Sequence, residues 1–192
     1  TMTTVNENTK IIYVGIDVHK DTYSACSFDV KEQEYFGQVK MKATSRNVIN
    51  YLERISKKYN DEVMIIAGYE AGPTGYDLYR DVQEAGFGCT VIAPTTIRKS
   101  NSKVKTDTRD AKLLAETLAY HTYSSVAVPD RNIFAMKEYT RARNSKKSKL
   151  KKAKQELLSF MLRTGKVYQK NKNESYWTVR HFRWLNEVVV TI

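Results

Sequence analysis

The sequence predicts an α/β protein, in which a mixed five-stranded sheet flanked by helices is followed by an extended helical arm. Three observations predict this fold class. Short apolar runs typical of strands recur through residues 11–92, and segments with helical spacing of apolar residues separate the later runs. Residues 130–164 then contain neither Pro nor Gly, which favours one long helix. We expect one domain over residues 1–125 and a basic, coiled-coil-like arm over residues 126–192.

The first three strands are expected at residues 11–17, 22–29 and 34–40, where polar junctions separate the apolar runs. Consecutive short strands of this kind are typical of an antiparallel meander. A helix follows and extends to about Lys58. Ser45 is its expected N-cap, because a hydroxyl side chain there precedes a stripe of apolar residues spaced by three and four.

The remaining two strands alternate with helices. Residues 63–69 form a nearly continuous apolar run, as in strands buried on both faces. We expect a helix at residues 76–85, a strand at 87–92 and a last helix at 107–120. Three strands followed by helix, strand, helix, strand and helix is the order of the ribonuclease H-like fold. Nucleases, recombinases and sugar kinases share that order, so the site has to decide the function.

Four acidic residues stand where this fold would gather them. Asp17 and Glu70 each end a predicted strand, and sites in open α/β sheets lie at the carboxyl ends of the strands. Asp107 and Asp110 are three residues apart at the start of the last helix, so their side chains share one face. Carboxylate oxygens are the ligands that Mg²⁺ or Mn²⁺ prefers. The alternative is structural, with Asp107 as an N-cap and both helix acids favoured by the helix dipole.

Charge is distributed unevenly along the chain. Residues 1–97 contain 10 Lys or Arg and 13 Asp or Glu, whereas residues 98–192 contain 22 and 8. A strongly basic half is typical of a protein that binds nucleic acid. No apolar run is long enough for a membrane span and no signal peptide opens the sequence, so we expect no membrane partner and a cytoplasmic location. The sequence has no P-loop, which disfavours nucleotide phosphotransfer, and Cys26 and Cys89 are expected to be buried and unpaired.

Basic side chains that could contact phosphates fall in three places. Lys20 and Arg109 adjoin the acids and could hold a phosphate or balance the carboxylates. His19 lies two residues after Asp17 and could contact a metal-bound water or a phosphate, although a lone histidine near a turn is more often incidental. On the arm, the alternative is a solvated charged face. The remaining candidates precede the last helix of the domain or lie on the arm: Arg98, Lys99, Lys103, Lys105, Arg141, Arg143, Lys146, Lys147, Lys151 and Lys152.

The arm also carries apolar and aromatic residues. Its apolar stripe predicts a partner helix, and with it a homo-oligomer that is a dimer or larger. Aromatic residues after the arm could stack on unpaired bases, or could equally form the core of a small helical unit. The stripe is Leu150, Ala153, Leu157, Leu158, Phe160 and Met161, and the aromatic residues are Tyr176, Trp177, Phe182 and Trp184.

Several segments together resemble a known family. In order, spacing and context they are similar to the DEDD transposases of the insertion-sequence IS-one-ten family. These enzymes are related to Piv-type DNA invertases, and their N-terminal domain is similar to the Holliday-junction resolvase RuvC. The most specific segment is Lys-Thr-Asp-Thr-Arg-Asp-Ala-Lys-Leu-Leu-Ala at residues 105–115. The other segments are Val-Gly-Ile-Asp-Val-His-Lys at 14–20, Tyr-Glu-Ala-Gly-Pro-Thr-Gly-Tyr at 69–76, and Val-Ile-Ala-Pro at 91–94 with Arg98 and Lys99.

This resemblance has specific implications. It implies that Asp17, Glu70, Asp107 and Asp110 are the family's four metal-binding acids. It also implies DNA transposition in a prokaryotic cell, with DNA and a structured guide RNA as partners. Family members have a further domain with a serine nucleophile, whereas this sequence ends at Ile192, so we expect this chain alone not to exchange strands. Two alternatives stay open, a non-catalytic nucleic-acid-binding and dimerisation module and a stand-alone resolvase-like nuclease.

Overall fold

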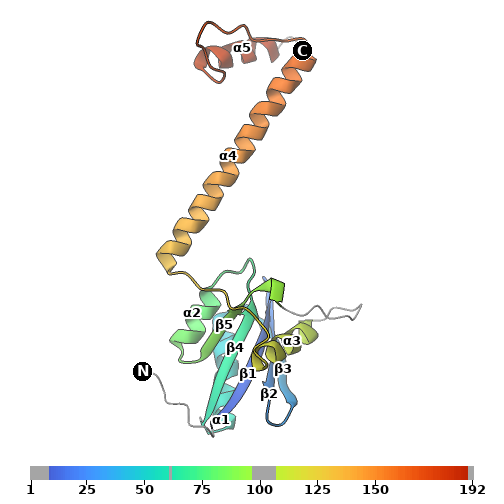
Figure 1. Cartoon of the computed structure of the whole chain (residues 1–192), viewed down its shortest axis with the longest axis vertical. Coiled ribbons are helices and arrows are strands. Elements are labelled where there is room, and N and C mark those ends of the chain that lie inside the picture. Colours follow the sequence, from blue (N-terminus) through green and yellow to red (C-terminus); the bar gives the residue numbers. More distant parts are fainter. Residues whose placement is uncertain (1–8, 61, 97–106, 190–192) are drawn as a thin grey trace. The chain divides into compact units, whose positions relative to one another are not determined.

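The computed structural model describes residues 9–60, 62–96 and 107–189 and divides the chain into two compact units. Unit 1 is Thr1–Val128 and unit 2 is Pro129–Ile192. Unit 1 contains a sheet with helices, and unit 2 contains helices joined by a loop (Figure 1). Each unit buries a set of apolar side chains of its own.

The sheet of unit 1 has five strands in the order β3-β2-β1-β4-β5. β1, β2 and β3 form an antiparallel meander, whereas β4 and β5 run parallel to β1. This combination of order and direction confirms the predicted ribonuclease H-like sheet. The strands are β1 (Lys10–Val18), β2 (Thr22–Asp29), β3 (Glu34–Lys42), β4 (Val63–Glu70) and β5 (Gly88–Ile92).

One face of the sheet is covered by two helices. These are α1 (Ser45–Lys58) and α2 (Asp77–Glu84). Because successive side chains of a strand point to opposite faces, alternate residues of β1 and β4 supply this core. Ile12, Val14 and Ile16 of β1 are fully buried there, together with Leu52 of α1.

The opposite face is covered by α3 (Asp107–Ala119). Its backbone lies directly on β1, since a Cβ atom added to Gly15 would be only 2.1 Å from the carbonyl oxygen of Ala111. Gly68 of β4 likewise leaves room for the side chain of Leu118, whose nearest atom would be 2.7 Å from an added Cβ. Two strand glycines therefore set how closely α3 approaches the sheet.

The N-cap of α1 differs from the expectation. Thr44 is in an extended conformation and its hydroxyl accepts from the backbone N–H of Asn47 at 3.3 Å, while Ser45 is already the first helical residue. The prediction of Ser45 was therefore wrong by one position. Both residues carry a hydroxyl, and only the backbone conformation decides which one caps the helix.

Unit 1 continues past its last helix. Ser125 forms an antiparallel bridge with Ile92 at the end of β5, and the backbone N–H of Val126 donates to the carbonyl of Val91 at 2.8 Å. Val126 and Val128 pack against the core formed with α1 and α2. This segment therefore covers part of the exposed edge of β5.

Unit 2 consists of the long helix α4 (Arg131–Arg163), a loop and α5 (Val179–Val189). At 1.5 Å per residue, α4 is about 50 Å long. The carboxylate of Asp130 caps it by accepting from the backbone N–H of Asn132 at 2.8 Å. In the described ranges, no helix is long and apolar enough to cross a membrane.

A small aromatic core holds the loop and α5 against the end of α4. His181 is completely buried, and its ring lies 4.7 Å from that of Tyr168 and 5.7 Å from that of Trp184, measured between centroids. The carboxylate of Glu174 accepts from the hydroxyl of Tyr168 at 2.6 Å and from Arg180 at 2.7 Å. These contacts confirm the core-packing interpretation for part of the aromatic cluster.

Candidate metal and nucleic-acid sites

The sheet register places Asp17 and Glu70 side by side. Ile16 pairs with Tyr69 across the parallel strands β1 and β4, and each acid is the next residue on its strand. Gly15 and Gly68, two residues earlier, both face α3, so the alternation of side chains directs both acids toward that face as well.

The direction of α3 brings its first turn to the same edge. Ala111 lies over Gly15, whereas the ring of His121, just past the helix, lies 6.3 Å from that of Tyr13, between centroids. Tyr13 precedes Gly15 on β1, so α3 runs antiparallel to the strand and starts near the strand's carboxyl end. Asp110 immediately precedes Ala111 and is half-buried in this first turn. Asp107 is the first residue of the helix, and its side chain is outside the described set.

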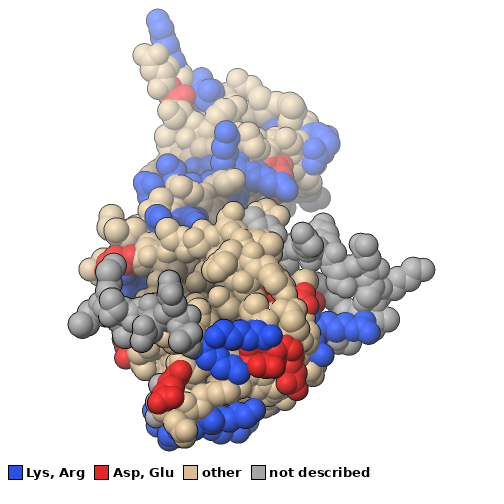
Figure 2. All heavy atoms as spheres, turned by 60° about the horizontal axis from the view of Figure 1, so that its bottom comes forward, with Lys and Arg blue, Asp and Glu red and all other residues tan. Residues whose placement is uncertain are grey.

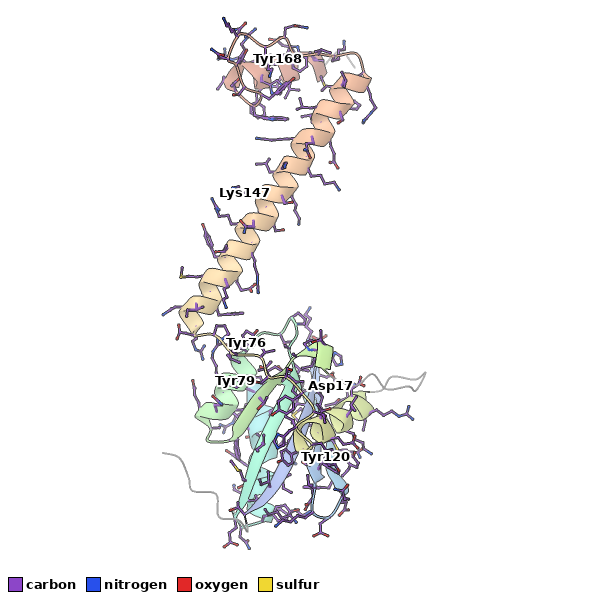
Figure 3. All side chains as sticks on the ribbon, viewed as in Figure 1. Asp17, Tyr76, Tyr79, Tyr120, Lys147 and Tyr168 are labelled. Atoms are coloured by element: carbon purple, nitrogen blue, oxygen red, sulfur yellow. The ribbon has the colours of Figure 1, made fainter. Side chains whose placement is uncertain are left out.

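The described acids differ in how they are paired. Asp17 lies near the carboxyl end of β1 (Figure 3), and one of its carboxylate oxygens is 3.0 Å from Nε2 of His19. The Asp17 side chain is 16% exposed. Ser24, a buried residue of β2, lies directly across from Asp17 in the register. Glu70 is exposed, and neither it nor Asp110 has an ion pair with a described residue.

Asp29 shows what a structural acid of this sheet looks like. It is 3% exposed, and its carboxylate lies 2.6 Å from Nζ of Lys10. Burial alone would raise the pKa of Asp29, but the Lys10 ammonium and the backbone N–H groups of Glu32 and Lys31 lower it overall. Among the described residues, Glu70 and Asp110 have no such partner, which distinguishes them from an acid such as Asp29 that stabilises the fold.

The four predicted ligands are not seen together as one site. Among the described side chains, no three His, Cys, Asp or Glu residues are close enough to hold a metal ion. Asp107 does not belong to that set, so the structure describes three of the four acids. The structure does show that each of three elements places an acid at the same end of the sheet. These are the carboxyl ends of β1 and β4 and the first turn of α3.

The basic candidates of unit 1 are only partly described. Lys20 is exposed in the turn after β1, and Arg109 is exposed in the first turn of α3. Both therefore lie near the acidic edge. The other four candidates are outside the described residues, namely Arg98, Lys99, Lys103 and Lys105.

The basic candidates of unit 2 all lie exposed on α4. Between Glu138 and Glu156 the helix carries eight Lys or Arg residues and no acid. Blue Lys and Arg lie beside red Asp and Glu on unit 1, whereas on the visible part of unit 2 blue is more frequent than red (Figure 2). Two of the candidates pair with the flanking acids, Arg141 with Glu138 and Lys152 with Glu156. The exposed candidates are Arg141, Arg143, Lys146, Lys147, Lys151 and Lys152.

The apolar stripe of α4 divides into two parts. Met161 is 2% exposed and Leu158 is half-buried, because the loop and α5 cover this end of the helix. Leu150 remains 56% exposed. The expectation that the whole stripe serves a partner helix therefore has to be reduced to the part that unit 2 leaves uncovered.

The two cysteines lie in strands β2 and β5 of the sheet. Both are buried and unpaired, as predicted. Burial raises the pKa of the Cys26 thiol to about 11 and that of the Cys89 thiol to about 12. Neither is therefore a reactive thiolate at neutral pH.

Two features of the sites were missed or underrated in the sequence. A single histidine leaves no periodic signal, so the sequence does not predict the 3.0 Å contact of His19 with Asp17. Lys154 was not singled out, although its Nζ lies 5.0 Å from the centre of the Trp177 ring. That contact depends on the folding of a loop onto α4, which helical spacing alone does not predict.

Comparison with known proteins decides the family. A family model described as transposase, of the DEDD type named after IS110, matches residues 14–165. The chain belongs to this transposase family. It is 37% identical over 179 residues to the putative transposase y4qE of Sinorhizobium fredii, covering 91% of this chain and 44% of that protein. It is 32% identical to the transposase for insertion sequence element IS1533 of Leptospira borgpetersenii, covering 92% of this chain and 50% of that protein.

The transposase relatives are therefore longer than the sequence described here. The chain spans about half the length of the curated relatives it matches. Among solved structures, T. thermophilus RuvC in complex with a Holliday junction substrate matches with a TM-score of 0.42 and 8% identity, covering 60% of this chain and 99% of that one. The family assignment confirms the resemblance noted in the sequence, and the element order confirms its fold.

Proposed function

We propose that this transposase chain acts on DNA phosphodiesters through a divalent metal held by Asp17, Glu70, Asp107 and Asp110. The observation that carries the proposal is the sheet register, which sets Asp17 beside Glu70 on the face where α3 begins. Carboxylates from two strand ends and one helix start would meet at the same end of the sheet. Such a place is suitable for Mg²⁺ or Mn²⁺.

The chemistry of the donor set fits such an ion. All four proposed ligands are carboxylates, which are the oxygen ligands of hard divalent cations. A divalent ion held by these carboxylates would supply activation of a water and stabilisation of the leaving oxygen of a phosphodiester. The protein's own part is to hold the acids on rigid elements, with His19 orienting the Asp17 carboxylate through its 3.0 Å contact. Lys20 and Arg109, exposed near this edge, would contact the DNA backbone.

Nucleic-acid binding is assigned mainly to the basic residues of α4. Eight cations without an intervening acid repel one another unless an anion screens them, and a phosphate backbone supplies that anion. We propose DNA and a structured guide RNA as the partners. The exposed Ile133 and Met136 of α4 would bind a second copy of the chain, so that the working form is a dimer or larger.

The proposal is tested by calorimetric titration of the 192-residue chain with Mn²⁺, alone and with duplex DNA. We expect weak binding to the free protein and tighter binding with DNA, whose phosphate adds ligands. The substitutions Asp17→Asn and Glu70→Gln should each abolish the heat of Mn²⁺ binding. Glu53→Gln is the matched control, because Glu53 is an exposed residue of α1 on the opposite face of the sheet. This variant should bind Mn²⁺ like the unmodified chain.

The outcomes separate this function from a non-catalytic nucleic-acid-binding module. Equal Mn²⁺ heats for the unmodified chain and Asp17→Asn, with DNA binding preserved in both, would show that the acids hold no metal. Metal binding that is lost in the variants, together with Mg²⁺-dependent nicking of labelled DNA, would support action on phosphodiesters.

A further inference from the structure

Trp177 is held in an unusual position in the loop before α5. Its backbone has a φ of 72°, in the left-handed region that bulky residues rarely adopt. The backbone N–H of Trp177 donates to Nδ1 of the buried His181 at 3.0 Å. The two rings meet edge to face, with centroids 5.0 Å apart. The ring is nevertheless only half-buried. The small core of unit 2 therefore fixes an indole ring that remains accessible.

The accessible side of this indole closes a groove along α4. The groove has a volume of about 310 Å³, and Leu150, Leu158 and Trp177 form its apolar surface. Lys147, Lys151 and Lys154 also line it, at intervals of four and three residues that place them on one face of the helix. None of these lysines has an ion pair with a described residue.

The charge of the groove decides which occupant it fits. A second copy of α4 would bring its own lysine-rich segment against these lysines, because no acid lies between Glu138 and Glu156. An anionic partner with a flat apolar group fits both parts of the groove. An unpaired nucleotide has this chemistry, since its base stacks on an aromatic ring and its phosphates meet the ammonium groups. In a duplex both faces of each base are already stacked.

We propose that the groove of α4 and Trp177 binds an unpaired segment of nucleic acid, with one base on the Trp177 indole and its phosphates at Lys147, Lys151 and Lys154. This inference deepens the proposed function, since it rests on nucleic-acid binding by unit 2. It assigns to this surface a preference for single-stranded over duplex segments.

The test uses the complete 192-residue chain and labelled oligouridine, oligothymidine and a duplex of equal length, with binding followed by fluorescence anisotropy. Trp177→Leu should weaken single-strand binding by about 5- to 150-fold, the effect of losing one stacked base, and should leave duplex binding unchanged. Trp177→Phe keeps an aromatic face and should recover most of the affinity. Lys151→Gln should reduce the log–log salt slope for the single strands by about 0.7.

Lys149→Gln is the matched control, because Lys149 lies on the opposite face of the same helix, about 160° from Lys151 at 100° per residue. It should retain single-strand affinity and show a smaller change in slope. Lys151→Gln also keeps the test valid if Trp177→Leu disturbs the core, since Lys151 is exposed and does not pack in it.

Three results would overturn the inference. If Trp177→Leu and Lys151→Gln both keep the single-strand affinity of Lys149→Gln, the groove is not the binding site. In Trp177→Leu, a loss of duplex binding as large as the loss of single-strand binding would contradict the preference for single strands. A concentration-dependent dimer that strengthens in Lys151→Gln would show that a second α4 occupies the groove. Failure of the unmodified chain to bind any of the three nucleic acids would instead contradict the proposed function.

Discussion

The two units of this transposase chain contain the same number of basic residues but differ in almost everything else. Unit 1 has 16 Lys or Arg and 16 Asp or Glu, whereas unit 2 has 16 and 5. Unit 1 buries two faces of a sheet, while unit 2 buries a few aromatic side chains at one end of a long helix. The comparison is consistent with the division of roles proposed above, in which unit 1 positions carboxylates and unit 2 contacts phosphates.

The largest expected effect concerns the rigidity of unit 1. Gly15→Ala should destabilise this unit by about 3 kcal/mol or more, because the new methyl group would lie 2.1 Å from the Ala111 carbonyl oxygen and 2.4 Å from the Ala115 nitrogen. Both contacts are with backbone atoms, so the helix would have to move. Urea unfolding followed by far-ultraviolet circular dichroism measures the loss.

Gly72→Ala is the matched control for Gly15→Ala. Its nearest contact would be 3.9 Å, and its change in unfolding free energy should stay within about 0.5 kcal/mol. Tryptophan fluorescence, which reports only unit 2 because both tryptophans lie there, should be the same in both variants. Equal stability of the two variants would contradict the close packing of α3 on β1.

The second effect concerns the charge of unit 2. Replacing Lys146, Lys147, Lys151 and Lys152 together by Gln should flatten the log–log salt dependence of duplex binding by about 3–4 units, if each lysine meets a phosphate. Replacing four exposed lysines of unit 1, Lys31, Lys42, Lys57 and Lys58, gives the same change in net charge and should alter the slope less. Equal changes would mean that net charge alone governs binding and that the units do not differ in this role.

The third effect is a pH dependence confined to unit 2. Burial lowers the pKa of His181, while the nearby Glu174 carboxylate raises it to a smaller extent. Protonation of His181 Nδ1 would also place an N–H donor against the backbone N–H of Trp177, which now donates to that nitrogen. The unfolded chain therefore takes up a proton below pH 6.5 more readily than the folded unit, so the stability of unit 2 is full above about pH 6.5 and decreases as the pH falls further.

Thermal unfolding followed by tryptophan fluorescence between pH 5 and pH 8 measures this dependence. His181→Gln keeps an acceptor for the Trp177 N–H and should flatten it. His121→Gln in unit 1 is the control and should keep the dependence of the unmodified chain. A flat profile for the unmodified chain would mean that His181 is not held in its neutral form by the aromatic core.

The smallest effect is expected at an ion pair of α4. Lys152 and Glu156 are 3.8 Å apart, and both side chains are largely exposed. Lys152→Gln should therefore change the unfolding free energy of unit 2 by no more than about 0.5 kcal/mol. A loss above about 1 kcal/mol in fluorescence-detected unfolding would indicate that unit 2 depends on its surface charges more than on its aromatic core.

The sequence was informative for unit 1 because strands buried on both faces leave continuous apolar runs. The runs ending at Asp17 and Glu70 predicted β1 and β4, and the ribonuclease H-like order followed from them. The pairing of these acids in register, and the close approach of α3 over Gly15, depend on contacts between distant segments. Local periodicity contains no such information.

Unit 2 was less predictable for a physical reason. Its long helix followed from the absence of Pro and Gly, but its core is formed by Tyr168, His181 and Trp184, which come from a loop and a short helix. The groove at Trp177 depends on a left-handed backbone conformation at a tryptophan, which residue preferences would not favour. The roles assigned to all the site residues stay predictions, and the basic candidates at residues 98–105 and the Asp107 side chain lie outside the described set.

The division of roles between the units is tested most directly by hydrogen exchange, with Mn²⁺ and a single-stranded oligonucleotide added separately to the same protein. We predict that Mn²⁺ slows exchange in peptides from the ends of β1 and β4 and the start of α3, and leaves unit 2 unchanged. The oligonucleotide should slow exchange around residues 143–158 and 174–181. Protection of α4 by Mn²⁺, or protection by the oligonucleotide confined to unit 1, would contradict the account.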